Sequence, residues 1–563
     1  MRLSRRTLLV GLVCATLIAD WPSPCSAGDG HIDRLMAEGD VPGLAMAVIR
    51  DGKIAQVSAY GFRDLATRQR VDVHTTFNAA SLGKPVFAYA VLQLVDQGRL
   101  SLDEPLSRYL PDYVPNDPRA ATITARQVLS HTSGLPNGIS EGHPLKTYFT
   151  PGERFSYSGE GFLYLQKAVE NITGEDLEAT AKRLVFDPLG MRDSSYVWQA
   201  RFGADYAEPY DTALQRGVKP KYATPKSAWS LETTAADYAR FLQAVATGTG
   251  LKEETARLWL TPQVKLSKQC SECLAGDEKN LTVNVAWGLG WGLEPDQGTF
   301  FQWGDAGWFK AFAVGSVRDR SAIVVFTNGA TGLSIMPDLI ASSMQGDRPA
   351  LAWLNYPHYD APDRRLIHAA LKNGIETAWR GIDHAALNEA ARRAVAIDLS
   401  ERGHEDDALW LRRQNVQDFP TSSACHFDLG ESDLARHRVD DALAEFRRAL
   451  EFDPKRSRAT MLVRILESGT YPTPLRHGRT EFRLAGYDHA GHVAAVGTFN
   501  GWEASGLPMR RTHYGWSVRT NLPAGSYLYL FSIDGAIIPD PGNPLHATAD
   551  PESASVLKVD TGP

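Results

Sequence analysis

The 563-residue chain contains only five cysteines, and this scarcity limits both metal chemistry and covalent cross-linking. Cys14 and Cys25 precede a predicted cleavage site, and Cys425 stands alone and is expected to be a buried small hydrophobe. Only Cys270 and Cys273 are close together, in the polar stretch "SKQCSECLAGDEKN". A four-ligand zinc site would need a second such pair, so no metal is expected. In an oxidising compartment the pair predicts a local disulfide, with a redox-active pair as the alternative.

The sequence also lacks a basic run and a long apolar run. Its formal net charge is −7, so charge does not favour a nucleic-acid partner. The apolar segment from Leu8 to Ile18 is shorter than the roughly 20 residues that a membrane-spanning helix needs. It follows Ser4-Arg5-Arg6 and precedes small residues that end near Ala27. This order predicts a twin-arginine-like export signal over residues 1–27. Its removal would leave a soluble periplasmic or secreted chain without a transmembrane span.

The remainder divides into three zones of different pattern. Residues 28–345 mix helices with strands, including a hairpin that turns at Asp51-Gly52. Residues 346–475 are helical, and Asp406-Asp407-Ala408-Leu409 recurs 34 residues later as Asp440-Asp441-Ala442-Leu443. Thirty-four residues is the tetratricopeptide period, which predicts two repeats over about 386–454. A spacer and a peptide-binding groove both fit such a short array.

Residues 476–563 form the third zone, in which short alternating segments are separated by Gly, Pro and Asn. This pattern predicts a small all-β, immunoglobulin-like sandwich. The chain is therefore expected to be a multidomain protein with an α/β domain first, a helical segment next and a β-sandwich last.

A serine and a lysine three residues apart stand at the head of the apolar stretch "NAASLGKPVFAYAVLQLV". The same spacing recurs at Ser555 and Lys558, but there the pattern alternates as in a strand, which puts the two side chains on opposite faces. Ser81 and Lys84 precede apolar residues at helical spacing and would share a face. Because proline is tolerated in a first turn, Pro85 predicts that the helix begins just before it, with Ser81 in the first turn, near the free amides. A helix cap is the alternative role for this serine.

Further motifs follow this pair in a fixed order along the first zone. They are "LSRYLPDY", "ITARQVLSHTSGLP", "PGERFSYSGEGFLYL" and "WGLGWGLEPDQGTFFQWGDAGWFKAF". With "AASLGK", they make residues 30–345 resemble the serine β-lactamase and penicillin-binding-protein superfamily, in its class C and esterase branch. The resemblance implies an antiparallel sheet flanked by helices, with a helical subdomain.

The resemblance also implies a nucleophilic serine that forms an acyl-enzyme. Ser81 would be this nucleophile, and either Lys84 or Tyr157 would accept its proton. Both side chains ordinarily have a pKa of about 10, so either would need a lowered pKa to act at neutral pH. Groups held this close titrate as a pair, so the sequence leaves the identity of the base open. The oxyanion hole would be the backbone N–H groups of Ser81 and Asp305. His131 is expected to be structural.

Two positions depart from the family pattern and bear on the substrate. Tyr157-Ser158-Gly159 stands where the family has Tyr-x-Asn, and Gln302-Trp303-Gly304 stands where it has Lys-Thr-Gly or His-x-Gly. A neutral Gln302 and a side-chain-free Gly159 remove contacts to an anionic lactam or peptide, while Trp303 could line an apolar acyl pocket. Carboxylic-ester hydrolysis or acyl transfer is therefore expected first. The alternatives are β-lactam or D-amino-acid peptide hydrolysis, and a non-catalytic binding protein with a degenerate hydrolase domain.

The third zone resembles family 48 carbohydrate-binding modules and the glycogen-binding domain of AMP-activated kinase, through "VGTFNGWEA" and "LPAGSYLYLFSIDGAIIPDPGNP". The resemblance implies a sugar platform of two tryptophans, a lysine and an asparagine. Trp502 supplies one of these, but Leu530, Ile537 and Ser555 stand at the other positions. Glycan binding is thus a possible extra activity beside a small-molecule ester, amide or β-lactam substrate. No cofactor is implied.

Overall fold

The computed structural model describes residues 29–139, 143–268, 270–276, 280–436, 438–467, 480–487, 489–500, 506–512, 515–523, 525–543 and 554–559. The predicted export signal, residues 1–27, lies outside these ranges. No helix in the ranges combines the length and apolarity needed to cross a membrane.

An antiparallel sheet forms the centre of the first domain, with the strand order β3-β2-β1-β11-β10-β9-β8-β7-β6. The strands are β1 (Gly43–Arg50), β2 (Lys53–Asp64), β3 (Gln69–Arg70), β6 (Val264–Ser267), β7 (Leu281–Trp287), β8 (Gly292–Glu294), β9 (Thr299–Asp305), β10 (Lys310–Ser316) and β11 (Ser321–Thr327). The β1–β2 hairpin turns at Asp51-Gly52, as predicted, and both residues have positive φ. β1 pairs with β11, so the beginning and the end of the domain lie side by side in its middle.

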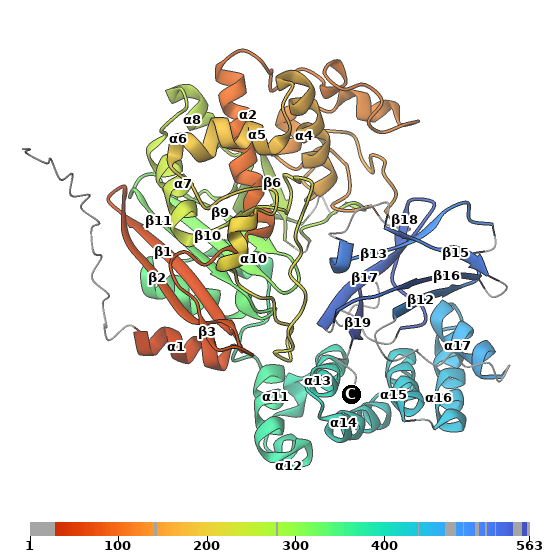
Figure 1. Cartoon of the computed structure of the whole chain (residues 1–563). Helices are drawn as coiled ribbons and strands as arrows, with labels where there is room; N and C mark the ends of the chain where they lie inside the picture. The colour runs from red at the N-terminus through yellow and green to blue at the C-terminus, as the bar shows by residue number, and fades with distance from the viewer. Residues whose placement is uncertain are drawn as a thin grey trace, which may run out of the picture.

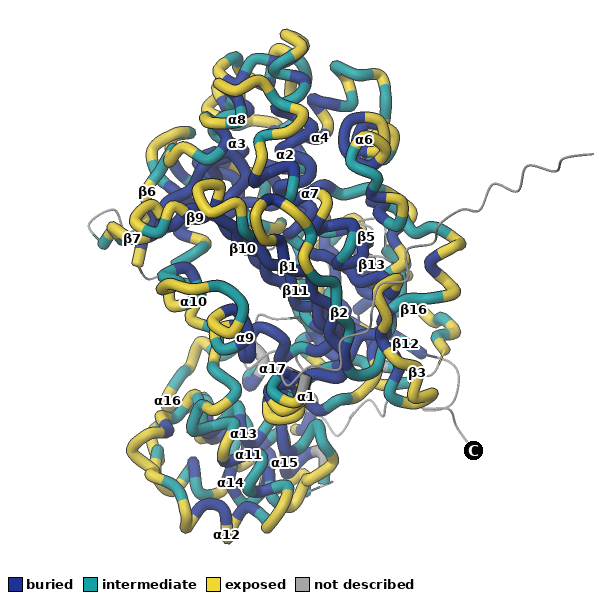
Figure 2. The backbone as a smooth tube through the Cα atoms, turned by 90° about the vertical axis from the view of Figure 1, so that its left-hand side faces the viewer, coloured by how far each residue is buried: buried dark blue, intermediate teal, exposed yellow. Residues whose placement is uncertain are grey.

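Helices cover both faces of this sheet, which explains why its central strands are apolar throughout. The helices are α1 (Asp29–Glu38), α2 (Gly83–Asp96), α7 (Ala235–Thr247), α8 (Glu253–Trp259) and α9 (Met336–Ser343). Along β1, Ala45 and Ala47 face the core shared with α2 and α7, while Leu44 and Met46 face the core shared with α1 and α9. The central strands are accordingly buried throughout in the tube view (Figure 2).

Shorter elements complete the first domain, and the helices among them pack around α2 to form a helical region (Figure 1). They are β4 (Phe77–Asn78), β5 (Glu232–Thr233), α3 (Ala125–Leu129), α4 (Gly159–Thr173), α5 (Leu177–Ala181) and α6 (Asp187–Leu189). β4 pairs with β5 directly before the Ser81 motif. The predicted α/β domain, with its antiparallel sheet and helical subdomain, is therefore the observed one.

The second zone is helical throughout its described residues, and its helix bounds repeat. The helices are α10 (Pro349–Leu354), α11 (Pro362–Asn373), α12 (Ile375–Arg380), α13 (Glu389–Glu401), α14 (Glu405–Asp418), α15 (Ser423–Ala435), α16 (Val439–Phe452) and α17 (Ser457–Glu467). Both bounds of α15 and α16 lie 34 residues after those of α13 and α14. Assignment to the tetratricopeptide class stays a prediction. Cys425, on α15, is buried as expected.

The third zone folds into two small sheets that share an apolar core. One has the order β12-β16-β15 and the other the order β14-β13-β17-β18, with β19 also paired to β17. The strands are β12 (Thr480–Ala485), β13 (Val493–Gly497), β14 (Leu507–Pro508), β15 (Arg510–Thr512), β16 (Gly515–Thr520), β17 (Gly525–Ile533), β18 (Ala536–Ile538) and β19 (Ser555–Val559). Ser555 and Lys558 thus lie on a strand, as predicted.

The sandwich packs one sheet against the first domain. Tyr529 and Phe531 of β17 point into the sandwich core, so Leu528 points out of it. There Leu528 and Val556 form a buried cluster with Trp308, which belongs to the loop after β9. Figure 1 shows β13 and β17 on the side of the sandwich that is turned toward the first domain.

A buried arginine ties the helical segment to the first domain. Arg402, after α13, pairs with Asp398 at 2.5 Å and with Asp40 at 2.7 Å, and it also donates to the Thr212 carbonyl. Its side chain is only 8% exposed. Each carboxylate also has a second partner, Arg364 at 3.2 Å from Asp398 and His368 at 3.2 Å from Asp40.

We expect Arg402→Ala to lower the free energy of unfolding by about 2 kcal/mol, because it removes the shortest ion pair of each of two largely buried carboxylates and leaves them only Arg364 and His368. Urea denaturation followed by tryptophan fluorescence measures this change. The control is Arg447→Ala, which removes the exposed pair with Glu467. The control should change stability by less than about 1 kcal/mol. Equal effects of the two substitutions would show that Arg402 is not a structural anchor.

Candidate active site

Ser81 lies on a tight turn with an unusual backbone. The turn is a single 3₁₀ segment, Ala80–Leu82, that precedes α2, so Pro85 is the third residue of the helix. The helix begins just before Pro85, as predicted, but Ser81 stands two residues before it, in the 3₁₀ turn rather than in the first turn of the helix. Ala80 has φ of +48°, a region that costs an alanine about 1 kcal/mol or more. Ser81 is half-exposed and can reach a substrate.

A buried polar chain holds this turn in place. The Ala80 N–H donates to Asn78 Oδ1 at 3.0 Å, and Asn78 Nδ2 donates to Glu232 Oε1 at 3.3 Å. Glu232 Oε2 pairs with Lys219 Nζ at 2.8 Å, and both side chains are at most 2% exposed. None of these supporting residues carries a sequence motif. Only the position of Asn78, just before "AASLGK", could have drawn attention to it.

Lys84 is placed to take the serine proton. Its Nζ lies 3.0 Å from Ser81 Oγ and donates to the Ala228 carbonyl at 3.0 Å. Burial lowers the pKa of Lys84 to about 7, and the Glu272 carboxylate opposes this shift. Near neutral pH the amine is therefore partly uncharged, with a lone pair available beside the hydroxyl.

Tyr157 completes the group on the other side of Lys84. Lys84 Nζ lies 4.6 Å from the centre of its ring, and its hydroxyl interacts with Ser81. Gln302 Nε2 donates to the Tyr157 hydroxyl at 2.9 Å. Burial raises the pKa of Tyr157 well above its usual value, so the phenol keeps its proton at neutral pH. It is suited to donate or relay a proton rather than to remove one.

His131 supports the tyrosine from behind. It is fully buried, stacks on the Tyr157 ring at 4.2 Å, and accepts the Ser158 N–H on Nδ1 at 3.0 Å. Its backbone carbonyl accepts from the Ser156 N–H at 2.8 Å. Burial lowers the pKa of His131, which keeps it neutral. This is the structural role that the sequence predicts.

The end of β9 closes against the nucleophile turn. A Cβ on Gly304 would lie 2.6 Å from the Ala79 carbonyl oxygen, so only glycine allows this approach. The approach brings the Asp305 backbone next to the Ser81 turn, as the predicted oxyanion hole requires. The Asp305 side chain turns to other partners, Lys310 and the Tyr356 hydroxyl.

Gly159 begins α4 and has no space for a side chain. A Cβ there would lie 2.5 Å from the Asn137 carbonyl oxygen. Asn137 comes directly after the His-Thr-Ser-Gly-Leu-Pro segment, and its Nδ2 donates to Glu272 Oε1 at 2.8 Å. Asn137 and Glu272 are functional candidates that the motifs did not indicate, although Glu272 lies between the paired cysteines.

The aromatic residues near β9 back the site rather than line a pocket. Trp303 packs on Tyr157 with ring centres 4.8 Å apart and on Trp353 at 5.7 Å. Trp308 is taken up by the contact with the sandwich. The expectation that Trp303 lines an acyl pocket is therefore corrected to a supporting position behind Tyr157.

The predicted sugar platform fits the sandwich poorly. Trp502 lies outside the described residues. Ser555 is fully buried and its hydroxyl accepts from the Asp540 N–H at 2.8 Å, so it cannot serve at the asparagine position. Leu530 shares its face of β17 with Leu528, which packs on the first domain.

Metal ligands do not gather in the part of the chain that the structure describes: no group of three His, Cys, Asp or Glu side chains there could hold an ion. The residues around Ser81 are those of covalent acyl transfer, a nucleophile beside an amine and a phenol. A family model described as beta-lactamase matches residues 29–342.

The chain belongs to the beta-lactamase family. A second model, described as the glycogen recognition site of AMP-activated protein kinase, matches residues 482–561.

Esterase EstB of Burkholderia gladioli is 32% identical to this chain over 225 residues, which are 34% of this chain and 57% of the esterase. Protein flp of Staphylococcus aureus (strain MRSA252) is 23% identical over 324 residues, which are 53% of this chain and 62% of that protein. The chain thus spans about three fifths of the length of these curated relatives. Among solved structures, a class C beta-lactamase aligns with a TM-score of 0.47 at 20% identity, over 57% of this chain and 96% of its own.

We expect the acylation rate of Ser81 to rise with pH through about 7 and to level off above it, because protonated Lys84 has no lone pair to accept the serine proton. Stopped-flow measurement with a neutral p-nitrophenyl ester between pH 5.5 and 9 tests this. Lys84→Arg, whose guanidinium stays charged, should lose at least about 100-fold at every pH. A wild-type rate that is flat from pH 5.5 to 8.5 would exclude Lys84 as the base.

We expect Gly159→Asn to destabilise the protein by about 2 kcal/mol, although it restores the family motif, because the new side chain collides with Asn137. Adding Asn137→Gly removes only the side-chain part of that collision, because the backbone carbonyl remains. The double variant should therefore recover part of the lost stability. Thermal denaturation of both variants measures this, and an unchanged Tm in Gly159→Asn would contradict the steric conflict.

Proposed function

We propose that this protein is a serine hydrolase that cleaves carboxylic esters through an acyl-enzyme on Ser81. The observation that carries the proposal is the 3.0 Å contact between Ser81 Oγ and the buried amine of Lys84. A serine alcohol is a weak nucleophile, and an adjacent base with a pKa near the working pH is what activates it.

The reaction follows from the positions of these groups. Ser81 Oγ attacks the ester carbonyl carbon while its proton passes to Lys84 Nζ. The oxyanion that forms accepts the backbone N–H groups of Ser81 and Asp305. When the carbon–oxygen bond to the leaving alkoxide breaks, Tyr157 donates its phenolic proton to the alkoxide and regains one from the Lys84 ammonium. Water then attacks the acyl-enzyme, and Lys84 again accepts the proton. When the bond between the acyl carbon and Ser81 Oγ breaks, that proton passes to Ser81 Oγ, which regenerates the enzyme and releases the acid.

Two features support an ester over a β-lactam. Gln302 is neutral and is engaged with Tyr157, so it offers no charge to a substrate carboxylate. Gly159 offers no amide side chain to an acyl-amide group, and Asn137 fills the space. The relative at 32% identity is named as an esterase. β-Lactam or D-amino-acid peptide hydrolysis is the second candidate, favoured by the shared family.

The test uses the mature protein with a fluorophosphonate probe and, separately, a labelled penicillin. Mass spectrometry locates the adduct, and Ser81→Ala is the control. We expect the phosphonate on Ser81 and no penicillin adduct. Labelling by both reagents would make β-lactam and peptide hydrolysis equal candidates. Lack of any adduct on folded protein would overturn the hydrolase and favour a binding protein.

For the remaining zones, we propose export by the twin-arginine-like signal, tetratricopeptide-type pairing of α13–α16, and a mainly structural sandwich. The burial of Ser555 and the packing of Leu528 on Trp308 support this role for the sandwich.

A pull-down on insoluble glycogen, comparing wild type with Trp502→Ala, tests glycan binding. We expect no retention of either protein. Retention of wild type that is lost in the variant would show a sugar site instead. Fractionation of the producing cell tests export, which a purely cytoplasmic protein would contradict.

A further inference from the structure

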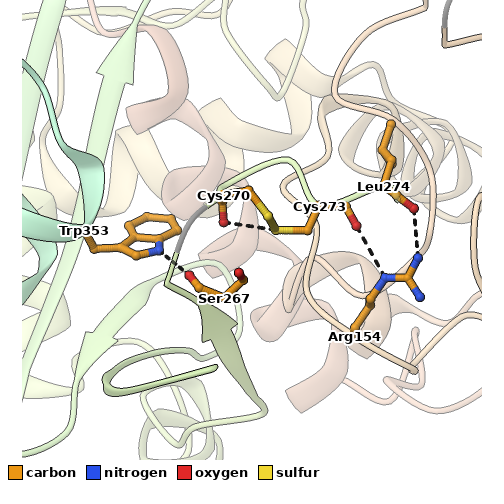
Figure 3. Close-up of a disulfide and its surroundings, with 6 residues drawn as sticks. All are labelled: Arg154, Ser267, Cys270, Cys273, Leu274 and Trp353. Atoms are coloured by element: carbon orange, nitrogen blue, oxygen red, sulfur yellow. Dashed lines mark hydrogen bonds between the residues drawn. A yellow bond between two sulfur atoms is a disulfide. The ribbon is translucent and has the colours of Figure 1, made fainter. Parts of the chain in front are cut away.

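A disulfide-closed loop forms one wall beside the catalytic residues. Cys270 and Cys273 are bonded, as predicted, and the Ser271 carbonyl between them accepts the Tyr157 N–H at 2.8 Å. Arg154 fixes the far end of the loop by donating to the Leu274 carbonyl at 2.8 Å (Figure 3). The loop is thus attached directly to the backbone of a catalytic residue.

This attachment brings the Glu272 carboxylate close enough to Lys84 for the two charges to interact. Its carboxylate accepts from Asn137, the residue whose carbonyl blocks the place of a side chain on Gly159. Glu272 therefore lies one hydrogen bond away from the residue that fills the place of the family's second-motif side chain. Glu272 is exposed, so a substrate can reach its carboxylate. Desolvation raises the pKa of this carboxyl above its usual value.

The carboxylate has no fixed cation. In the part of the chain that the structure describes, Glu272 makes no ion pair, and its hydrogen bond is to a neutral amide. His143 and Lys84 are the cationic groups whose charge it feels, and Lys84 is uncharged when it acts as the base. Glu272 thus adds a negative charge close to Lys84, while Gln302, at the third motif, adds no positive one.

We propose that Glu272 is a specificity-determining residue that favours acyl groups carrying a cationic ammonium or amine and disfavours anionic ones. The inference rests on the proposed ester hydrolysis and names its substrate class. It requires no change in the chemistry at Ser81. The carboxylate interacts with the charge of the bound acyl chain, and the disulfide fixes its distance from the reacting carbonyl.

Three p-nitrophenyl esters of similar size test the proposal at pH 8. They carry a 4-(trimethylammonio)butanoyl group, its neutral isostere 5,5-dimethylhexanoyl, and the anionic glutaryl group. We expect wild type to prefer the cationic over the neutral ester by about tenfold in kcat/KM, after correction for the uncatalysed rates. Glu272→Gln should abolish this preference, which is read as the ratio of kcat/KM for the cationic and neutral esters within each variant.

Glu272→Lys should invert the order, so that the glutaryl ester becomes the better charged substrate. A purely structural role of Glu272 would not produce this inversion. The control is Glu254→Gln, which changes the net charge equally but lies on α8. Lys252, at the start of that helix, donates its backbone N–H to Asp96 at the C-terminal end of α2. Lys84 lies at the opposite end of α2, so this helix is remote from it. This control should keep the wild-type preference.

The outcomes separate this inference from the proposed function. Ser81-dependent hydrolysis of the neutral ester without charge preference, or a preference that Glu272→Gln retains, overturns the role of Glu272 and leaves the esterase standing. Failure of wild type to hydrolyse any of the three esters, with no phosphonate adduct on Ser81, overturns the proposed function and this inference together.

Discussion

The geometry of the whole site depends on one turn that its own sequence does not favour. Ala80 holds a left-handed backbone conformation directly before the nucleophile. The conformation persists because Asn78 binds the Ala80 amide and because the buried Lys219–Glu232 pair binds Asn78. Strain of this kind is stable only where the surroundings determine it fully. The proposed nucleophile is therefore held by residues that are buried behind it.

The parts of this arrangement that local patterns encode could be predicted. Helical spacing after Ser81, the turn at Asp51-Gly52 and alternation near Ser555 each arise from a few neighbouring residues, and the corresponding elements are present. α2 begins just before Pro85, as predicted, but the pattern could not show that Ser81 lies in a separate 3₁₀ turn. The motif positions of Tyr157 and Gln302 were also recognisable, and the two side chains do meet.

The supporting residues could not be predicted, for a physical reason. Lys219 lies in an irregular segment and pairs with Glu232 of β5, and neither belongs to a periodic pattern that would show their contact. Asn137 and Glu272 lie 135 residues apart and meet only because the disulfide loop returns to Tyr157. Long-range contacts between polar groups leave no periodic trace in a single sequence. Trp303 misled in the opposite direction. Its place inside a motif suggested a contact with substrate, but its ring packs against Tyr157 from behind.

The position of β19 has a consequence for how the protein is made. This strand delivers Val556 to the Trp308 cluster, in the loop that follows Asp305, and its Lys558 contributes a charge near Asp211 and Glu401. These three charged residues come from the sandwich, the first domain and the helical segment. While the chain is still on the ribosome, residues of the first domain are complete long before β19 emerges. The loop that carries Trp308, beside the candidate site, therefore reaches its final packing only after translation has passed residue 559. Until then the first domain is complete but this loop is uncovered.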